Sequence, residues 1–272
     1  MNASDRRWAL ILGASSGFGG ATAVELARNG YSIFGVHLDR RDTLPNAERV
    51  QEQIRAAGGE AIFFNANAGD PETVESVIAA IRQRVGQQHQ PPATDLSPVR
   101  VMLHSIAFGT LKRYIGQART ERVSEKGLNM TLHLMANTLV YWVQALLEAG
   151  LLGHGGRIFA MTSSGGHRVW HSYGAVSAAK AALESHVRQL ALELAPLGVT
   201  VNAIQAGVTD TPALRKIPDY QQMIEYACRI NPHRRLTTVE DVARAIVVLA
   251  DERTQWITGN VIRVDGGEDI VG

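Results

Sequence analysis

The stretch WALILGASSGFGG, residues 8–20, decides the fold of this chain. A short apolar run enters a turn with glycines at positions 13, 17 and 19, and the next segment, ATAVELARNG, has helical apolar spacing. A strand, a glycine-rich turn and a helix in this order let backbone N–H groups approach a pyrophosphate where the helix dipole favours negative charge. A strand-to-helix turn without a ligand is the alternative, but the position after the first strand favours a dinucleotide site.

Outward from this stretch, strand-like and helix-like segments alternate along the chain. Short apolar runs lie at residues 8–12, 32–38, 61–65, 99–104, 157–162, 199–204 and 261–264. The longer segments between them have apolar residues at helical spacing. This alternation predicts an α/β fold, a doubly wound parallel sheet of about seven strands with helices on both faces. We find no repeat or linker that would divide residues 1–272 into more than a single domain.

Composition narrows the class of protein. The chain has 272 residues, 45% of them hydrophobic, and its 27 Lys and Arg nearly balance 26 Asp and Glu. It can therefore bury a large core, and its net charge predicts no nucleic-acid or membrane partner. The single cysteine, Cys228, excludes an internal disulfide, and no metal-ligand spacing is present. Without a signal peptide or a membrane-spanning stretch, a soluble cytoplasmic protein is expected.

The segment SYGAVSAAK contains the most informative pair of side chains. Tyr173 and Lys180 are seven residues apart, and the apolar spacing of residues 178–194 predicts a helix. Seven residues are about two helical turns, so the phenol and the ammonium lie on one face, roughly 10 Å apart along the axis. Both groups can then reach one ligand. One turn before Lys180 stands Val176.

Several separated motifs resemble the short-chain dehydrogenase/reductase family over essentially the whole chain. They are the glycine pattern, LHSIAFG (103–109), Ser163, Lys180, VNAIQAG (201–207) and VDGG (264–267). Most members of this family carry Tyr four residues before Lys, whereas its enoyl-acyl-carrier-protein reductases carry it seven before, as here. HSIAFG, AKAALESHVRQLALELAPLGVTVNAIQAG and NPHRRLTTVEDVA also resemble that branch, in particular its bacterial members with the ordinary glycine pattern. The resemblance implies a single dinucleotide-binding Rossmann domain and NAD(P)H-dependent reduction of the 2,3 double bond of an enoyl thioester in fatty acid synthesis.

The resemblance also implies roles for three residues. Hydride transfer to the β-carbon drives negative charge onto the thioester oxygen, and the Tyr173 hydroxyl would stabilise that oxygen. Lys180 would bind the nicotinamide ribose and favour a more acidic phenol. Ser163 stands where other members have a catalytic Ser or a second Tyr, and it either orients the substrate or satisfies the end of a strand. The family Asn of the proton relay falls near Met135, so the relay has no assigned residue.

Cofactor binding is assigned along the crevice edge of the sheet. Besides Lys180, the residues are Gly13, Ser15, Ser16, Gly17, Phe18, Gly19, His37, Arg40, Arg41, Asn67, Ala68, Ser105, Ile106, Ala107, Gly207, Val208 and Thr211. After the second strand the signals conflict, because His37 stands where NAD-preferring members have an acidic residue, and Asp39 precedes the two arginines. An Asp would bind ribose hydroxyls, whereas Arg would pair with a 2′-phosphate. The arginines and the resemblance favour NADPH, with NADH and a purely solvated arginine pair as the alternatives.

Residues 208–236 correspond to the substrate flap of the family. This segment carries excess positive charge at Arg215, Lys216, Arg229, Arg234 and Arg235. An acyl carrier protein is acidic, so these residues are docking candidates, with a solvated face as the alternative and coenzyme A as the other carrier. The apolar segments 130–147 and 178–194 suit a subunit interface, and the resemblance implies a homotetramer.

Two rival functions stay open. One is another reductase of the same family, acting on a carbonyl such as a 3-oxoacyl thioester or on a dienoyl thioester. Carbonyl reduction needs a proton donor closer to the nicotinamide, and Val176 occupies that position. The other rival is a non-catalytic NADP-binding sensor, which the retained Tyr173 and Lys180 disfavour.

Overall fold

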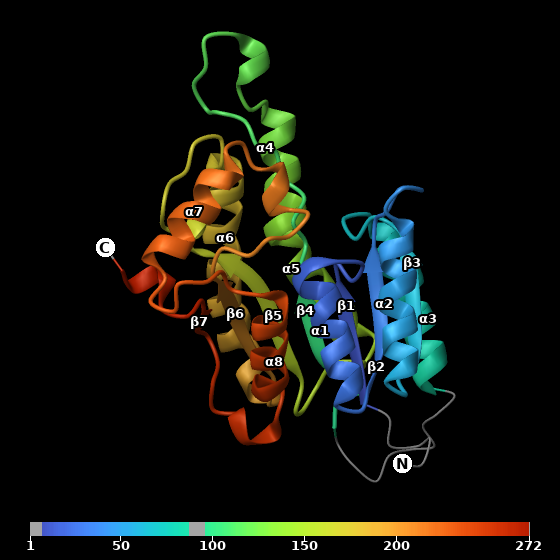
Figure 1. Ribbon diagram of the computed structural model, residues 1–272. Helices are drawn as coiled ribbons and strands as arrows, with labels where there is room; N and C mark the ends of the chain where they lie inside the picture. Colours follow the sequence, from blue (N-terminus) through green and yellow to red (C-terminus); the bar gives the residue numbers. More distant parts are fainter. Residues whose placement is uncertain (1–6, 87–95, 272) are drawn as a thin grey trace.

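The computed structural model describes residues 7–86 and 96–271, which contain one seven-stranded parallel sheet (Figure 1). The strand order is β3-β2-β1-β4-β5-β6-β7. The strands are β1 (Arg7–Leu12), β2 (Tyr31–His37), β3 (Ala61–Asn65), β4 (Val99–His104), β5 (Arg157–Ser163), β6 (Thr200–Ala206) and β7 (Val261–Val264). The predicted doubly wound α/β fold is confirmed, and every strand lies within one or two residues of its predicted range.

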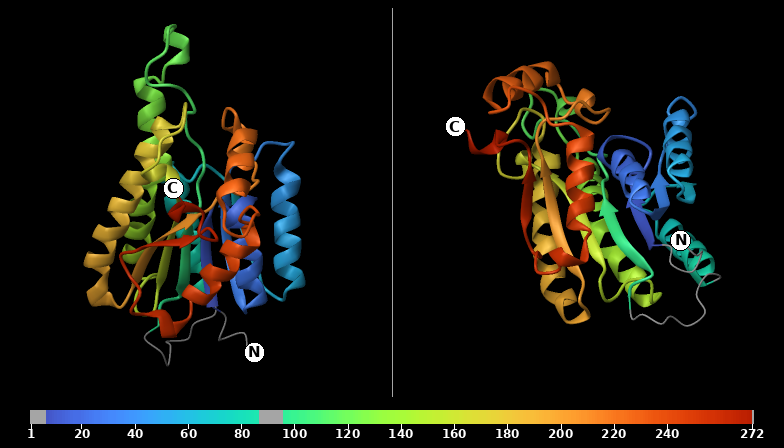
Figure 2. Two further views of the ribbon diagram at one scale, coloured as in Figure 1. Left: turned by 60° about the vertical axis from the view of Figure 1, so that its left-hand side comes forward. Right: turned by 60° about the horizontal axis from the view of Figure 1, so that its bottom comes forward.

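Helices cover both faces of the sheet (Figures 1 and 2). The helices are α1 (Gly17–Arg28), α2 (Leu44–Ala56), α3 (Pro71–Gly86), α4 (Glu125–Leu132), α5 (Thr138–Glu148), α6 (Gly174–Leu194), α7 (Tyr220–Ile230) and α8 (Val239–Leu249). Apolar side chains of α1, α2 and α8 pack on one face, and those of α3, α5 and α6 pack on the other. None of the helices in the described ranges combines the length and apolar character that a bilayer crossing requires.

The central strands are apolar on both sides because both of their faces are covered. Every residue of β2, β4 and β6 is buried. Within the core, the Trp8 ring stacks on Phe34 with 4.3 Å between centroids. Each such fully buried side chain contributes about 1.5–3 kcal/mol to folding. The sheet is therefore a rigid base for the loops at its ends.

The direction of winding reverses at β1. This strand lies between β2 and β4, so the chain builds the sheet first to one side of β1 and then to the other. In open parallel sheets, ligands bind at such a reversal, outside the carboxyl ends of the strands. Helices α4 and α7 and their connections gather at this end in Figure 1. Within the predicted flap, the structure places a 3-10 turn, Leu214–Lys216, and α7.

Two local features of the helices differ from the predicted pattern. Helix α6 begins at Gly174, four residues before the predicted start, and Tyr173 is its N-cap. Glycine and serine in its first turn are weak helix formers, which hid this start in the sequence. Between α4 and α5 the chain forms a π-helical turn, His133–Asn137, and Met135 is buried within that turn.

Candidate active site

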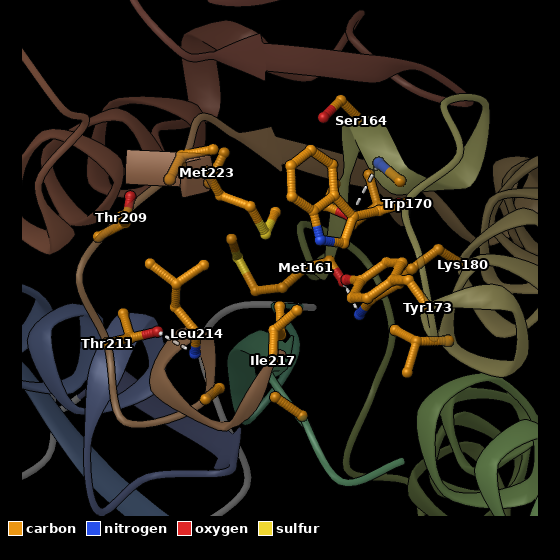
Figure 3. Close-up of a pocket in the computed structure, with 18 of the residues that line it drawn as sticks. Met161, Ser164, Trp170, Tyr173, Lys180, Thr209, Thr211, Leu214, Ile217 and Met223 are labelled. Carbon is orange, nitrogen blue, oxygen red and sulfur yellow. Dashed lines mark hydrogen bonds between the residues drawn. The ribbon is translucent and has the colours of Figure 1, made fainter. Parts of the chain in front are cut away.

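A cavity of about 490 Å³ opens at the carboxyl end of the sheet, where the winding reverses. Most of its walls come from three parts of the chain: the segment after β4, the connection from β5 into α6, and the segment after β6; Phe18, Met135 and Glu268 complete them. Figure 3 shows Tyr173 and Lys180 on one side of this cavity and Leu214 and Ile217 on the other. The two residues that the sequence paired therefore face the same space.

The glycine-rich turn beside the cavity leaves no room for a side chain at Gly13 or at Gly19. A Cβ added at Gly13 would lie 2.4 Å from the Ser105 carbonyl oxygen, and one at Gly19 would lie 2.1 Å from the Gly13 oxygen. Gly13 also has a φ of +89°. The N-cap Ser16 makes no side-chain capping bond to the first turn of α1, so this helix start is suited to receive a phosphate. The turn thus fits the pyrophosphate of a dinucleotide.

Tyr173 is held by its neighbours at the start of α6. Its hydroxyl interacts with that of Ser163, which also accepts the Gly165 N–H at 3.2 Å. The ring lies against Gly165, where an added Cβ would be 2.5 Å from the Tyr173 Cε1 atom. Burial raises the pKa of Tyr173, and the Ser163 bond opposes this rise. The phenol is therefore a protonated hydrogen-bond donor at neutral pH.

Lys180 lies beneath the cavity with its ammonium buried. Its Nζ donates to the Met161 carbonyl at 2.6 Å. Burial lowers the pKa of Lys180 to about 8, although the charge of Glu184 acts in the opposite direction. The Glu184 carboxylate in turn accepts the Thr162 hydroxyl at 2.6 Å. Lys180 is thus a buried cation beside the tyrosine, with little of its charge balanced nearby.

A buried histidine lies behind this lysine. The Nε2 of His104 is 2.8 Å from the Thr138 hydroxyl, which itself donates to the Leu134 carbonyl. Burial, and secondarily the charge of Lys180, lowers the pKa of His104 to about 3. His104 is therefore neutral at physiological pH and connects the end of β4 to α5.

The position one turn along α6 from Tyr173 is apolar. Val176 packs with Met135 of the π-helical turn and with Ala179 in a small buried cluster. A Cβ at Gly109 would lie 2.9 Å from the Val176 side chain and 2.9 Å from the Met135 sulfur. Position 176 therefore offers an apolar surface and no hydroxyl group.

The predicted site residues divide into two groups. Ten of them line the cavity: Phe18, Ser105, Ile106, Ala107, Ser163, Tyr173, Lys180, Gly207, Val208 and Thr211. The others lie outside that cavity, in the glycine-rich turn and after β2 and β3: Gly13, Ser15, Ser16, Gly17, Gly19, His37, Arg40, Arg41, Asn67 and Ala68. Among them, the Ala68 carbonyl accepts the Trp142 indole N–H at 2.9 Å, which ties the loop after β3 to α5.

After β2, the aspartate Asp39 interacts with Ser15 of the glycine-rich turn. The Asp39 carboxylate is 2.8 Å from His37 Nδ1 and also forms side-chain hydrogen bonds with Ser15 and Thr43. Burial alone would raise its pKa, but these bonds hold it below its usual value. Arg40 and Arg41 are exposed. An anionic oxygen is thereby fixed beside Ser15 of the turn.

The far end of the cavity is apolar and contains residues that the sequence did not single out. Trp170 and Met223 lie opposite each other in Figure 3, near Met161 and Tyr173. Arg168 and Glu268 also line the cavity. The proximity of Trp170 to Tyr173 in the chain could have marked it. No local pattern in the sequence indicates a role for Glu268, because its partner Val208 lies 60 residues earlier in the chain.

Comparison with known proteins places the chain in a family. Residues 13–268 match the family described as enoyl-(acyl carrier protein) reductase. The chain is 32% identical to the enoyl-acyl-carrier-protein reductase (NADH) FabI of Aquifex aeolicus, over 88% of this chain and 83% of the relative. It is 29% identical to 1-cyclohexenylcarbonyl-CoA reductase of Streptomyces collinus, over 99% of this chain and 89% of the relative.

A solved structure extends the comparison to another substrate. The promiscuous reductase LugOII, which catalyses keto-reduction at C1 during lugdunomycin biosynthesis, has a TM-score of 0.80 at 26% identity. The match covers 97% of this chain and 98% of LugOII. The chain is therefore an oxidoreductase of the short-chain dehydrogenase/reductase family, close to the enoyl-acyl-carrier-protein reductases.

Proposed function

We propose that this protein reduces the 2,3 double bond of an enoyl thioester, as an enoyl-acyl-carrier-protein reductase does in fatty acid synthesis. The observation that carries the proposal is the seven-residue spacing of Tyr173 and Lys180, which both line the cavity, with Val176 buried in an apolar cluster between them. The acyl group would occupy the apolar end of the cavity near Trp170 and Met223.

The family binds a nicotinamide cofactor, which supplies a hydride to the β-carbon when it is bound. The residues of this chain stabilise the charge that develops on the thioester oxygen. The Tyr173 hydroxyl, oriented by Ser163, donates to that oxygen, and such a donor is worth about 2.7–4 kcal/mol. Lys180, whose Nζ donates to the Met161 carbonyl, would hold the ribose of the bound cofactor, and its charge would favour the acidity of the phenol.

A carbonyl reductase is the second candidate. It is favoured by the similarity to LugOII, which catalyses a keto-reduction. Carbonyl reduction places the hydride on the carbon that bears the oxygen, so the proton donor must stand nearer the nicotinamide. The buried contact of Val176 with Met135 disfavours this candidate, because neither side chain can donate a proton.

The test is turnover of matched thioesters. Purified protein is incubated with NADH or NADPH and with crotonyl or acetoacetyl thioester, each on coenzyme A and on acyl carrier protein, and nicotinamide absorbance is followed. We expect oxidation with a crotonyl thioester, and Tyr173→Phe should lower kcat by about 10²–10³-fold with cofactor affinity preserved. Tyr141→Phe, at a half-exposed tyrosine of α5, is the control. Oxidation with acetoacetyl thioester alone would establish the carbonyl reductase instead.

We further propose NADH as the preferred cofactor, in place of the NADPH that the two arginines favoured. Asp39 supports this choice, because its carboxylate is fixed beside Ser15, where it can accept ribose hydroxyls and would repel a 2′-phosphate. Asp39→Ser should weaken NADH binding by about tenfold and reduce the ratio of the protein's affinity for NADH to its affinity for NADPH. Both affinities are measured by nucleotide fluorescence titration. The exposed neighbour Asp42→Ser is the control. Tighter binding of NADPH than of NADH by the unmodified protein would refute the proposal.

The same proposal includes the assembly that the sequence favours. Helices α5 and α6, the latter with its exposed Leu192, would contribute to a homotetramer interface.

A further inference from the structure

We propose that Glu268 and Asp269 form a carboxylate clamp that positions both walls of the cavity for reaction. The two residues follow the VDGG motif in a short 3-10 turn, Glu268–Ile270. One carboxylate holds the connection from β5 into α6, and its neighbour holds the segment after β6. Each is assigned to act through the backbone and side chains that it holds, so both are positioning residues. The inference rests on the proposed function for the choice of substrate, whereas the contacts of Glu268 and Asp269 are independent of that function.

Asp269 holds the wall that carries Tyr173. Its side chain is 3% exposed and contacts two arginines, through Arg168 Nε at 2.8 Å and Arg263 Nε at 3.2 Å, and the imidazole of His167 through Nε2 at 3.0 Å. Gln205 of β6 donates a further bond at 3.0 Å. Arg168 also donates from Nη2 to the Asp269 carbonyl at 2.8 Å. His167 and Arg168 are thereby fastened to a turn about a hundred residues later in the chain.

The fastened residues lie next to the seat of the tyrosine. The His167 and Arg168 N–H groups both bond the Ser164 carbonyl, at 3.1 and 2.7 Å, which closes a compact turn. That turn contains Gly165, against which the Tyr173 ring packs. A shift of the turn therefore shifts the ring. Catalysis is sensitive to such movement, because a displacement of about 1 Å can lower a rate about 10²-fold.

Glu268 holds the opposite wall. Its two carboxylate oxygens lie 3.1 and 3.2 Å from the Val208 N–H, and the residue is 6% exposed while lining the cavity. Val208 begins the segment that leads to Thr211, and both residues line the cavity at the proposed cofactor edge. The bond to Glu268 fixes the backbone of that segment where it leaves β6.

The two carboxyl groups work differently. Burial would raise the pKa of Asp269, but Gln205, His167 and Arg168 hold it below its usual value, so it acts as a charge. Burial raises the pKa of Glu268 above its usual value, and the Val208 N–H opposes this rise. The contact that Glu268 makes with Val208 is that of a hydrogen-bond acceptor, which an amide oxygen can replace. A neutral amide cannot replace Asp269 among its cationic partners.

The experiment measures the effect of each carboxylate on turnover and on cofactor affinity separately. We expect Asp269→Asn to lower kcat by about tenfold or more while NADH affinity stays within about twofold. We expect Glu268→Ala to weaken NADH binding by about tenfold, and Glu268→Gln to restore it to within about twofold. NADH affinity is measured by fluorescence titration, and turnover is measured with whichever thioester the unmodified protein reduces.

The controls distinguish positioning from stability. Asp251→Asn removes a carboxylate that pairs with Arg253 outside the cavity, and it should change neither readout. Melting temperature is recorded for every variant. Unchanged kcat in Asp269→Asn, or the same loss of both readouts in Asp269→Asn and Glu268→Gln, would overturn the clamp. Since cofactor binding needs no turnover and the assay substrate is chosen by activity, failure of the proposed enoyl reductase function would leave this test intact.

Discussion

The glycine-rich turn and the floor of the cavity are built on opposite principles. In the turn, backbone atoms approach Gly13 and Gly19 so closely that no side chain fits at either position, and this close packing fixes the site. At the floor, Lys180 keeps a buried charge that the cofactor-free protein balances poorly. Close backbone packing thus stabilises the turn, whereas the buried ammonium of Lys180 lowers the free energy of unfolding. Substitutions in the two regions should therefore change stability in opposite directions.

The largest effect is expected in the turn. Gly19→Ala places a methyl group 2.1 Å from the Gly13 carbonyl oxygen, a backbone contact that no side-chain rotation relieves. We expect a loss of about 3 kcal/mol or more in the free energy of unfolding, measured by urea denaturation. The control is Gly153→Ala, where an added Cβ meets nothing within 4 Å and the stability should change by less than about 0.5 kcal/mol. A Gly19→Ala protein as stable as this control would remove the steric argument.

A smaller effect of opposite sign is expected at the floor. The pKa of Lys180 is about 8 in the folded protein against an ordinary 10.5, so the unfolded chain binds this proton more tightly. The destabilisation is full below pH 8, amounts to about 3 kcal/mol, and disappears as pH rises to 10.5. Replacing Lys180 also removes a hydrogen bond worth about 1 kcal/mol. Lys180→Met should therefore stabilise the cofactor-free protein by about 2 kcal/mol at pH 7.

The measurement is thermal and urea unfolding of Lys180→Met without nucleotide, between pH 7 and pH 10. The gain over the unmodified protein should shrink as pH rises, while cofactor binding is lost. Exposed Lys126→Met is the control and should show no such pH dependence. If Lys180→Met were the less stable protein at pH 7, the buried ammonium would be well compensated, and the contrast between the two regions would fail.

The same contrast explains what could be predicted from the sequence. Gly13 and Gly19 shape the site because they have no side chain, and Val176 does so because it has no hydroxyl group. Such features can be identified in a sequence without any knowledge of the neighbouring residues. The strands could be predicted equally well, because strands of a sheet that is covered on both faces form continuous apolar runs in the sequence. The start of α6 at Gly174 was missed, since packing there overrides weak helix propensity.

Contacts between distant residues could not be predicted. Asp39 was visible as an acidic residue beside two arginines, but its bonds to Ser15 and His37 depend on how the loop folds back. Asp269 bonds His167 and Gln205 at separations of 102 and 64 residues. Because such pairs form only when the chain has folded, no local spacing in the sequence predicts them.

The contacts of Val176 with Met135 and Gly109 also bear on which side chains position 176 can hold. Val176 packs with Met135, and Gly109 has no room for a side chain of its own against either of them. A larger side chain at position 176 would therefore have to displace Met135 or extend into the cavity that Val176 also lines. The choice of residue there is thus shared among α6, the π-helical turn and the segment after β4.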